Sequence, residues 1–276
     1  VLTEQLAGQV AVVTGAGRGI GRGVALVLAN RGARVVVSDL EVDSAEIVAG
    51  EIVASGGQAI SATCDVTDSK STEALVFKAT KKFGQVDICV PNAGVVGGPN
   101  FETRSDFTEQ DWDITYGVNL KGVVNTTQSV IPQMKSRRSG KIVIVASQGG
   151  RKPQGPRVGY GRQIIPYLVS KAAVIQWGHL LAQDLGHYNI NVNCVCPGTV
   201  WTPLWERIAN NRMSAAAAGD AITALDVYQE TVEARHPLPI EQTPEDIGYA
   251  VAFLSSESAS EITGQALNVN AGAVLN

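Results

Sequence analysis

Charge, aromatic side chains and cysteine are all scarce in this chain of 276 residues. Charged residues make up 17% of it, aromatic residues 5%, and there are four cysteines. Acidic residues outnumber basic ones by 26 to 22, and no basic run stands out beyond Lys135-Ser-Arg-Arg138. We expect that cluster to solvate the end of a helix, so the charge pattern argues against a nucleic-acid partner.

Long apolar runs are also missing. No run reaches the length of a transmembrane helix, and the first residues lack the basic-then-apolar pattern of a signal peptide. The four cysteines lie in short apolar runs, and neither they nor the three histidines show the spacing of a metal or redox motif. We therefore expect a cytoplasmic protein with no membrane partner and no metal ion.

Short apolar runs instead alternate with stretches of helical periodicity. We expect strands over 10–14, 34–39, 58–64, 86–90, 141–147, 190–196 and 266–270, and helices over 22–29, 44–55, 71–83, 109–136, 166–185 and 244–255. This order predicts an α/β fold, a Rossmann-like doubly wound parallel sheet of about seven strands with helices on both faces. No linker or low-complexity break interrupts it, so we expect a single domain over 1–276.

A glycine-rich turn follows the first expected strand. Gly15, Gly19 and Gly21 stand between Val10–Thr14 and the first helical stretch. Such a turn lets backbone N–H groups approach a pyrophosphate, whose charge the positive end of the helix dipole stabilises. The spacing differs from the G-x-G-x-x-G fingerprint, so a tight turn without a ligand remains the alternative.

Acidic residues follow the next two expected strands, at the sheet edge where doubly wound folds bind ligands. Asp39 lies 24 residues after Gly15 (39 − 15). A carboxylate at that place accepts hydrogen bonds from the adenosine ribose and repels a 2′-phosphate. Asp39 therefore favours NAD, whereas Arg18 in the turn favours NADP. Asp65 either contacts the adenine or caps a turn.

A tyrosine and a lysine stand four residues apart at the start of the expected helix 166–185. Tyr167 and Lys171 would lie on one helical face, about one turn apart. A free phenol has a pKa of about 10, and its use as a base at neutral pH needs that pKa lowered to about 7. An adjacent ammonium, a helix N-terminus and a positively charged nicotinamide supply this together. Taken alone, the two residues also fit a solvated surface pair.

Further motifs complete an ordered series: Thr14-Gly15-x-x-x-Gly19-x-Gly21, Asp39, Asp65, Asn92-Ala-Gly94, Asn119, Ser147, Tyr167-x-x-x-Lys171 and Pro197-Gly198-x-Val200-x-Thr202. With this series the chain closely resembles the short-chain dehydrogenase/reductase family over nearly its whole length. The resemblance implies that Tyr167 exchanges a proton with the substrate oxygen and that Ser147 hydrogen-bonds the same oxygen. Lys171 would lower the pKa of Tyr167 and hold the nicotinamide ribose, and Asn119 would support a water relay to Lys171.

The same resemblance implies how the cofactor binds. Asn92 and Gly94 would line the adenosine side, and Val200 with Thr202 would hold the nicotinamide carboxamide. The expected cofactor-binding residues are Gly15, Arg18, Gly19, Ile20, Gly21, Asp39, Asp65, Val66, Asn92, Ala93, Gly94, Tyr167, Lys171, Pro197, Gly198, Val200 and Thr202.

Substrate contacts and assembly follow from the resemblance as well. A substrate lid would lie at about 200–240, and the expected substrate contacts are Ser147, Gln148, Trp201 and Trp205. Packing against a neighbouring subunit is the alternative for the two tryptophans. The family typically forms tetramers through its long helices, here 109–136 and 166–185, so we expect a homotetramer.

The distance between the serine and the tyrosine departs from the family pattern of about a dozen residues. Tyr167 lies 20 residues after Ser147 (167 − 147), whereas Tyr160 lies 13 after it (160 − 147). Residues after Tyr160 offer neither a lysine four positions on nor a helix start. We therefore assign the role to Tyr167 and expect a lengthened loop over 148–165.

These features together predict an NAD-dependent oxidoreductase that interconverts a secondary alcohol and a ketone. An NADP-dependent carbonyl reductase with the same site is one alternative. The other is a non-catalytic dinucleotide-sensing protein, against which Ser147, Tyr167 and Lys171 argue because a binding module needs no proton-transfer pair.

Overall fold

One sheet of seven parallel strands forms the centre of the molecule, in the order β3-β2-β1-β4-β5-β6-β7. The computed structural model describes residues 5–153, 161–215 and 222–275. The strands are β1 (Val10–Thr14), β2 (Arg34–Asp39), β3 (Gln58–Thr63), β4 (Ile88–Val90), β5 (Gly140–Val145), β6 (Ile190–Pro197) and β7 (Ala266–Val269). The expected fold class is confirmed, and each strand matches its expected bounds to within two residues.

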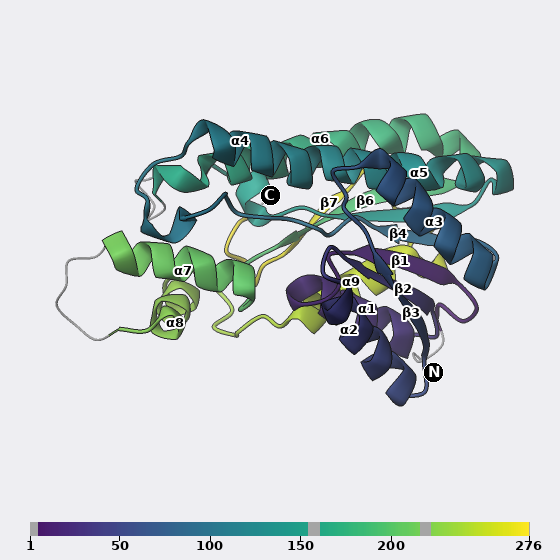
Figure 1. Ribbon diagram of the computed structural model, residues 1–276, viewed down its shortest axis with the longest axis horizontal. Helices are drawn as coiled ribbons and strands as arrows, with labels where there is room; N and C mark the ends of the chain where they lie inside the picture. The colour runs from purple at the N-terminus through teal and green to yellow at the C-terminus, as the bar shows by residue number, and fades with distance from the viewer. Residues whose placement is uncertain (1–4, 154–160, 216–221, 276) are drawn as a thin grey trace.

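Helices cover both faces of the sheet (Figure 1). On one face pack α1 (Gly19–Asn30), α2 (Val42–Ala54) and α9 (Pro244–Ser255), and on the other α3 (Ser69–Phe83), α5 (Gly122–Arg137) and α6 (Ile165–Leu185). Successive strand residues point to opposite faces, so Val13 joins the first core and Val12 the second. Both cores bury β1 completely, which is why that strand is continuously apolar instead of alternating.

The winding direction reverses between β1 and β4. The chain runs outward from β1 to β3 and then crosses back to place β4 on the other side of β1. Loops after the strands therefore diverge at this point and leave a crevice at the carboxyl ends of the strands. The glycine turn after β1 and Asn92 after β4 both lie there.

Two regions differ from the expected helices. The stretch expected as one long helix consists of α4 (Glu109–Thr115), a π-helical segment (Tyr116–Lys121) and α5. The segment expected as a lid contains two helices that were not expected, α7 (Pro203–Ala215) and α8 (Ala224–Arg235). These two helices pack on each other beyond the end of the sheet (Figure 1). None of the helices in the described part of the chain combines the length and apolar character that a membrane span requires.

Candidate active site

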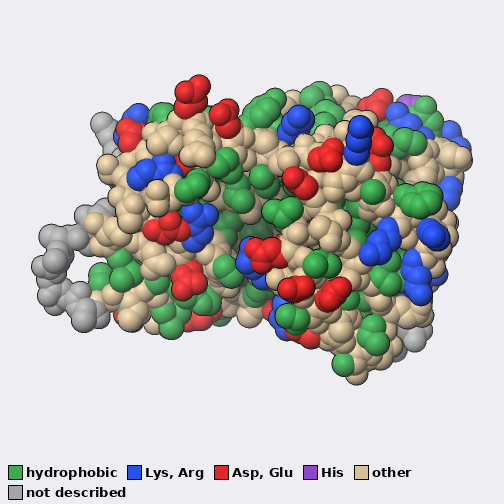
Figure 2. Space-filling model, in the orientation of Figure 1, with side chains coloured by type: hydrophobic (Ala, Val, Ile, Leu, Met, Phe, Trp, Pro, Cys, Tyr) green, Lys and Arg blue, Asp and Glu red, His purple; other side chains and the backbone are tan. Residues whose placement is uncertain are grey.

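A cavity of about 330 Å³ lies at the carboxyl ends of the strands. It extends from the glycine turn after β1, past the ends of β4 and β5, to the first turns of α6 and α7. Figure 2 shows a hollow near the middle of the molecular surface that it draws, with hydrophobic side chains inside the hollow. Every expected cofactor-binding residue lines the cavity, as do Ser147, Gln148 and Trp205. Asn119 and Trp201 are not among the described residues that line it.

The N-terminus of α1 is open to this cavity. No side chain of the described residues caps α1, and its first turn holds no acid, whereas α3, α4, α8 and α9 each have a capping side chain. Uncapped N–H groups at the positive end of a helix dipole bind anions well. The donors present therefore fit the pyrophosphate of a dinucleotide.

Glycine is required in the turn for steric reasons. Gly15 and Gly19 have positive φ angles of 62° and 55°, a region that glycine enters freely. A Cβ on Gly21 would lie 2.2 Å from the Gly15 carbonyl oxygen and 2.5 Å from Asn92 Nδ2. Asn92 Nδ2 in turn donates to the carbonyls of Thr14 (2.9 Å) and Gly15 (3.0 Å), which ties the end of β4 to the turn. The turn is thus held tightly enough to exclude side chains.

Asp39 is fixed at the rim of the cavity by the glycine turn itself. Its Oδ2 accepts the N–H of Gly17 at 2.9 Å, and its Oδ1 accepts the N–H of Glu41 at 3.3 Å. Arg18 also lines the cavity, but its side chain is 60% exposed and its guanidinium lies 3.7 Å from the Glu41 carboxylate. The negative charge of Asp39 is therefore held in place, while Arg18 interacts with an acid at the surface.

Asp65 closes a turn at the edge of the cavity, and its contact with the adenine remains a prediction. It lines the cavity, and its Oδ1 accepts the N–H of Thr67 at 2.9 Å and the Thr67 hydroxyl at 2.7 Å. The carboxylate thus closes the turn after β3 and still borders the space next to Val66.

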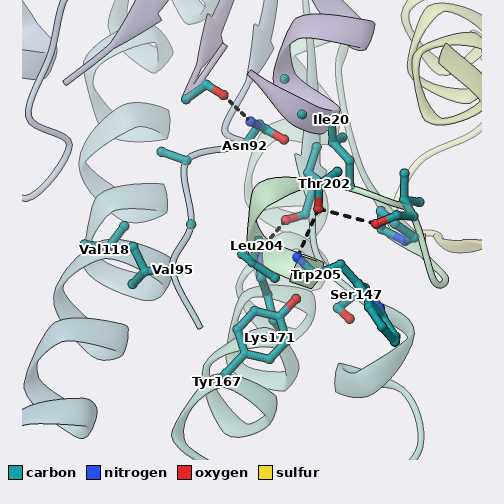
Figure 3. Close-up of a pocket in the computed structure, with 18 of the residues that line it drawn as sticks. Ile20, Asn92, Val95, Val118, Ser147, Tyr167, Lys171, Thr202, Leu204 and Trp205 are labelled. Carbon is teal, nitrogen blue, oxygen red and sulfur yellow. Dashed lines mark hydrogen bonds between the residues drawn. The ribbon is translucent and has the colours of Figure 1, made fainter. Parts of the chain in front are cut away.

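Two elements, β5 and α6, bring Ser147, Tyr167 and Lys171 together (Figure 3). Ser147 follows β5, and its Oγ accepts the N–H of Gly149 at 3.1 Å. Tyr167 stands in the first turn of α6, directly after Pro166, whose fixed φ suits that position. The hydroxyls of Ser147 and Tyr167 turn toward the same part of the cavity, and Lys171 lies behind the tyrosine ring. Tyr160, the alternative tyrosine, lies outside the described residues.

Lys171 is buried beneath Tyr167. The side chain is 4% exposed, its Nζ donates to the Val145 carbonyl at 2.9 Å, and Nζ lies 5.8 Å from the centroid of the Tyr167 ring. Loss of hydration on burial lowers the pKa of Lys171 to about 8. A positive charge is therefore available beside Tyr167 at neutral pH, in surroundings that screen it little.

Asn119 lies behind the cavity wall. It lies fully buried in the π-helical segment, where its Oδ1 accepts the N–H of Val95 at 2.8 Å. Its Nδ2 donates to the Val95 carbonyl at 2.8 Å and to Ser170 Oγ at 3.0 Å. The side chain thus joins the segment after β4 to α6, and its part in a water relay remains a prediction.

The two tryptophans of the expected lid both pack on Tyr228, but of the two only Trp205 is among the described residues that line the cavity. Trp205 lines the cavity from α7. Trp201 packs edge-on against Tyr228 of α8, with ring centroids 5.2 Å apart. Trp205 packs edge-on against the same Tyr228 ring, with centroids 5.3 Å apart, so both tryptophans support the α7–α8 pair. A substrate contact for Trp201 remains a prediction.

Comparison with known proteins identifies the family. A family model described as short chain dehydrogenase matches residues 9–213. The chain belongs to the short-chain dehydrogenase/reductase family. It is therefore an oxidoreductase of a family that uses a nicotinamide dinucleotide, NAD(H) or NADP(H).

Several relatives of this short-chain dehydrogenase have named activities. Cyclohexanol dehydrogenase of Rhodococcus sp. (strain TK6) is 38% identical, over 97% of this chain and 96% of that one. The 7alpha-hydroxysteroid dehydrogenase of Escherichia coli (strain K12) is 34% identical, over 98% and 96%. The crystal structure of levodione reductase matches with a TM-score of 0.85 and 27% identity, over 97% and 98%. These relatives support alcohol and ketone chemistry.

One end of the dehydrogenase cavity is apolar, and the sequence did not reveal the residues that form it. They are Ile164, Leu168, Leu204 and Ile208, which line the cavity and pack in one cluster with Tyr167. The sequence did contain a helical spacing that points to these residues. Ile164 and Leu168 stand four residues apart on either side of Tyr167. Leu204 and Ile208 have the same spacing just after Thr202. Which face of α7 meets the cavity depends on how that helix docks, and spacing alone does not determine that.

No metal site accompanies this cavity in the described ranges. Within residues 5–153, 161–215 and 222–275, no group of three or more His, Cys, Asp or Glu side chains is placed to hold a metal ion.

Proposed function

We propose that this chain is an NAD-dependent dehydrogenase that interconverts an uncharged secondary alcohol and the corresponding ketone. The observation that carries the proposal is the presence of Ser147, Tyr167 and Lys171 in one cavity with the uncapped N-terminus of α1. A dinucleotide sensor needs only the uncapped helix N-terminus. Proton transfer also needs the group of Ser147, Tyr167 and Lys171.

Each catalytic residue has one task in this mechanism. The bound nicotinamide supplies or accepts the hydride. During oxidation, Ser147 donates a hydrogen bond to the substrate oxygen, and the phenolate of Tyr167 takes the proton of that oxygen. The buried ammonium of Lys171 stabilises the phenolate, because opposite charges attract more strongly where water is excluded. In the reductive direction Tyr167 returns the proton to the oxygen.

Asp39 supports NAD as the cofactor. A 2′-phosphate next to its carboxylate would repel it, and the hydrogen bond from Gly17 keeps that carboxylate from turning aside. Arg18 is the feature that favours the alternative, an NADP-dependent carbonyl reductase. Its ion pair with Glu41 at the surface would have to open before the guanidinium met a phosphate.

The apolar end of the cavity supports an uncharged substrate. Among the described residues that line this end next to Tyr167, Lys171 is the only charged one, and it lies beneath the tyrosine ring. Moving a carboxylate into such a place without a partner costs several kcal/mol. The relatives whose names specify cyclohexanol and a hydroxysteroid support a cyclic secondary alcohol.

A substrate screen tests this function. Cyclic and linear secondary alcohols, polyols and hydroxy acids are incubated with the protein and either NAD or NADP, and the absorbance of the reduced nicotinamide is followed. We expect cyclic secondary alcohols to reduce NAD fastest. Faster turnover with NADP would support the carbonyl reductase, and tight NAD binding without turnover of any alcohol would support the non-catalytic alternative.

A further inference from the structure

Asn211 of α7 connects three segments that are far apart in the sequence. Its side chain is 3% exposed. Nδ2 donates to the carbonyl oxygens of Phe101 (2.8 Å) and Arg104 (2.7 Å), and Oδ1 accepts a hydrogen bond from Nε2 of Gln163. One buried amide thus bonds α7 to the segment after β4 and to the entry of α6.

These three segments surround the apolar end of the cavity. Phe101 is fully buried and packs with Val96 and Ile164 in a small core that also includes Ile208. Gln163 stands four residues before Tyr167, in the turn that leads into α6. Asn211 is not among the described residues that line the cavity, so it acts on the cavity only through its partners.

A second contact from the same face of α7 reinforces the first. Arg207, one helical turn before Asn211, forms an ion pair with Glu102 and donates to the Gly98 carbonyl at 3.0 Å. Its hydrogen bond lowers the pKa of Glu102. Glu102 and Gly98 belong to the same segment as Phe101, so α7 docks on that segment at two successive turns.

The segment after β4 is itself anchored. Asp111 of α4 is fully buried, accepts the N–H of Gly98 at 2.7 Å and forms an ion pair with Arg104 at 2.6 Å. Burial alone would raise the pKa of Asp111, but the hydrogen bonds from Arg104, Gly98 and Thr108 outweigh it and hold that pKa below its usual range. Asn211 therefore attaches α7 to a segment that already has a fixed shape.

We propose that Asn211 is a positioning residue that assembles the substrate end of the cavity by fixing α7 against the segment after β4 and the entry of α6. The inference rests on the proposed function, because it assigns Asn211 a part in binding the alcohol or ketone. Replacing the amide by an apolar group removes the donor to the Arg104 carbonyl and the acceptor for the buried Gln163 amide. The Phe101 carbonyl keeps only the longer hydrogen bond from the Arg104 N–H, at 3.4 Å. These losses disfavour the docked arrangement.

Steady-state kinetics with an alcohol substrate test the inference. The variant Asn211→Leu removes all three hydrogen bonds at similar volume, and Asn210→Leu on the next residue is the matched control. We expect Asn211→Leu to raise KM for the alcohol by about tenfold or more, with kcat and the Kd of NAD changed by less than about twofold. A purely structural role would lower Tm and leave KM unchanged, and that result would overturn the inference.

Hydrogen exchange provides a test that does not depend on turnover. In Asn211→Leu we expect faster amide exchange in 97–104, 162–164 and 203–214 together, with the strands unchanged and Asn210→Leu like the wild type. If Asn211→Leu does not fold, Gln163→Met removes only the contact to α6 and should raise exchange in 162–164 and in α7. Faster exchange in α7 alone, or in none of these segments, would contradict the inference even if no alcohol were a substrate.

Discussion

At the scale of single residues, Lys171 shows most clearly how burial and function are linked. An ammonium with 4% exposure has lost most of its hydration, and its pKa falls to about 8 from an ordinary value of 10.5. The folded protein therefore holds this proton less tightly than the unfolded chain does. The charge that supports Tyr167 is retained at a cost in stability.

This cost predicts a pH dependence of unfolding. The buried ammonium destabilises the fold fully below pH 8, and the penalty disappears as the pH rises from about 8 to 10.5, because the unfolded chain binds more protons in that window. We expect the free energy of unfolding of the wild type to rise relative to that of Lys171→Met over this range, by roughly 3 kcal/mol. Chemical denaturation of both proteins at several pH values measures the difference, and a constant difference would contradict the burial argument.

Asp39 is the single residue that we expect to determine whether NAD or NADP is used. Replacing Asp39 by Ser removes the charge that repels a 2′-phosphate, so we expect kcat/KM with NADP to rise by about tenfold or more relative to NAD. Asp43→Ser, at an exposed acid in the first turn of α2, is the matched control for net charge. An unchanged ratio of NADP to NAD turnover in Asp39→Ser would show that the acid does not select the cofactor.

At the scale of elements, two glycines in helices should respond in opposite ways to alanine. Gly21 of α1 has no room for a Cβ, which would meet the Gly15 carbonyl oxygen at 2.2 Å, whereas a Cβ on Gly50 of α2 meets nothing within 4 Å. We expect Gly21→Ala to lower stability and weaken dinucleotide binding. Gly50→Ala should instead raise stability by about 0.5–1 kcal/mol, because alanine is the better helix former.

Thermal unfolding and NAD titration of both variants test this contrast. Normal NAD affinity in Gly21→Ala would show that the turn does not need its close contacts.

The elements differ in how far the sequence could predict them. Strands were predictable because continuous apolar runs at regular intervals have few alternatives in an α/β protein. The π-helical segment at Tyr116–Lys121 was not, since its side chains continue the helical period. Helix α8 could have been predicted, because Thr223 and Asp226 form the same capping box as Thr243 and Asp246 before α9.

At the scale of the whole molecule, the place of the residues expected to bind the cofactor was predictable, and the apolar wall of the cavity was not. Asp39, Asn92 and the glycine turn lie at strand ends, whose meeting at one sheet edge follows from parallel topology. The apolar wall around Leu204 and Ile208 depends instead on the docking of α7, which buried contacts such as those of Asn211 determine. Contacts of that kind leave no periodic trace in the sequence.

Assembly is the second property at this scale. Exposed apolar side chains stand on the π-helical segment that leads into α5 and on α6, namely Tyr116 (59%), Val169 (49%) and Leu180 (51%). We expect a homotetramer in which these helices pack between subunits. Light scattering should give four times the mass of one chain, and Leu180→Arg should give a smaller species. A wild-type monomer would contradict this expectation.

The value of kcat in Tyr167→Phe decides whether this phenol moves the proton. The change removes one hydroxyl and keeps the ring, so we expect kcat for alcohol oxidation to fall by about 1,000-fold with Tm unchanged, since acid–base groups contribute on this order. Tyr160→Phe, measured alongside, should keep kcat near that of the wild type. Full activity in Tyr167→Phe together with its loss in Tyr160→Phe would contradict the mechanism and transfer the role to the other tyrosine.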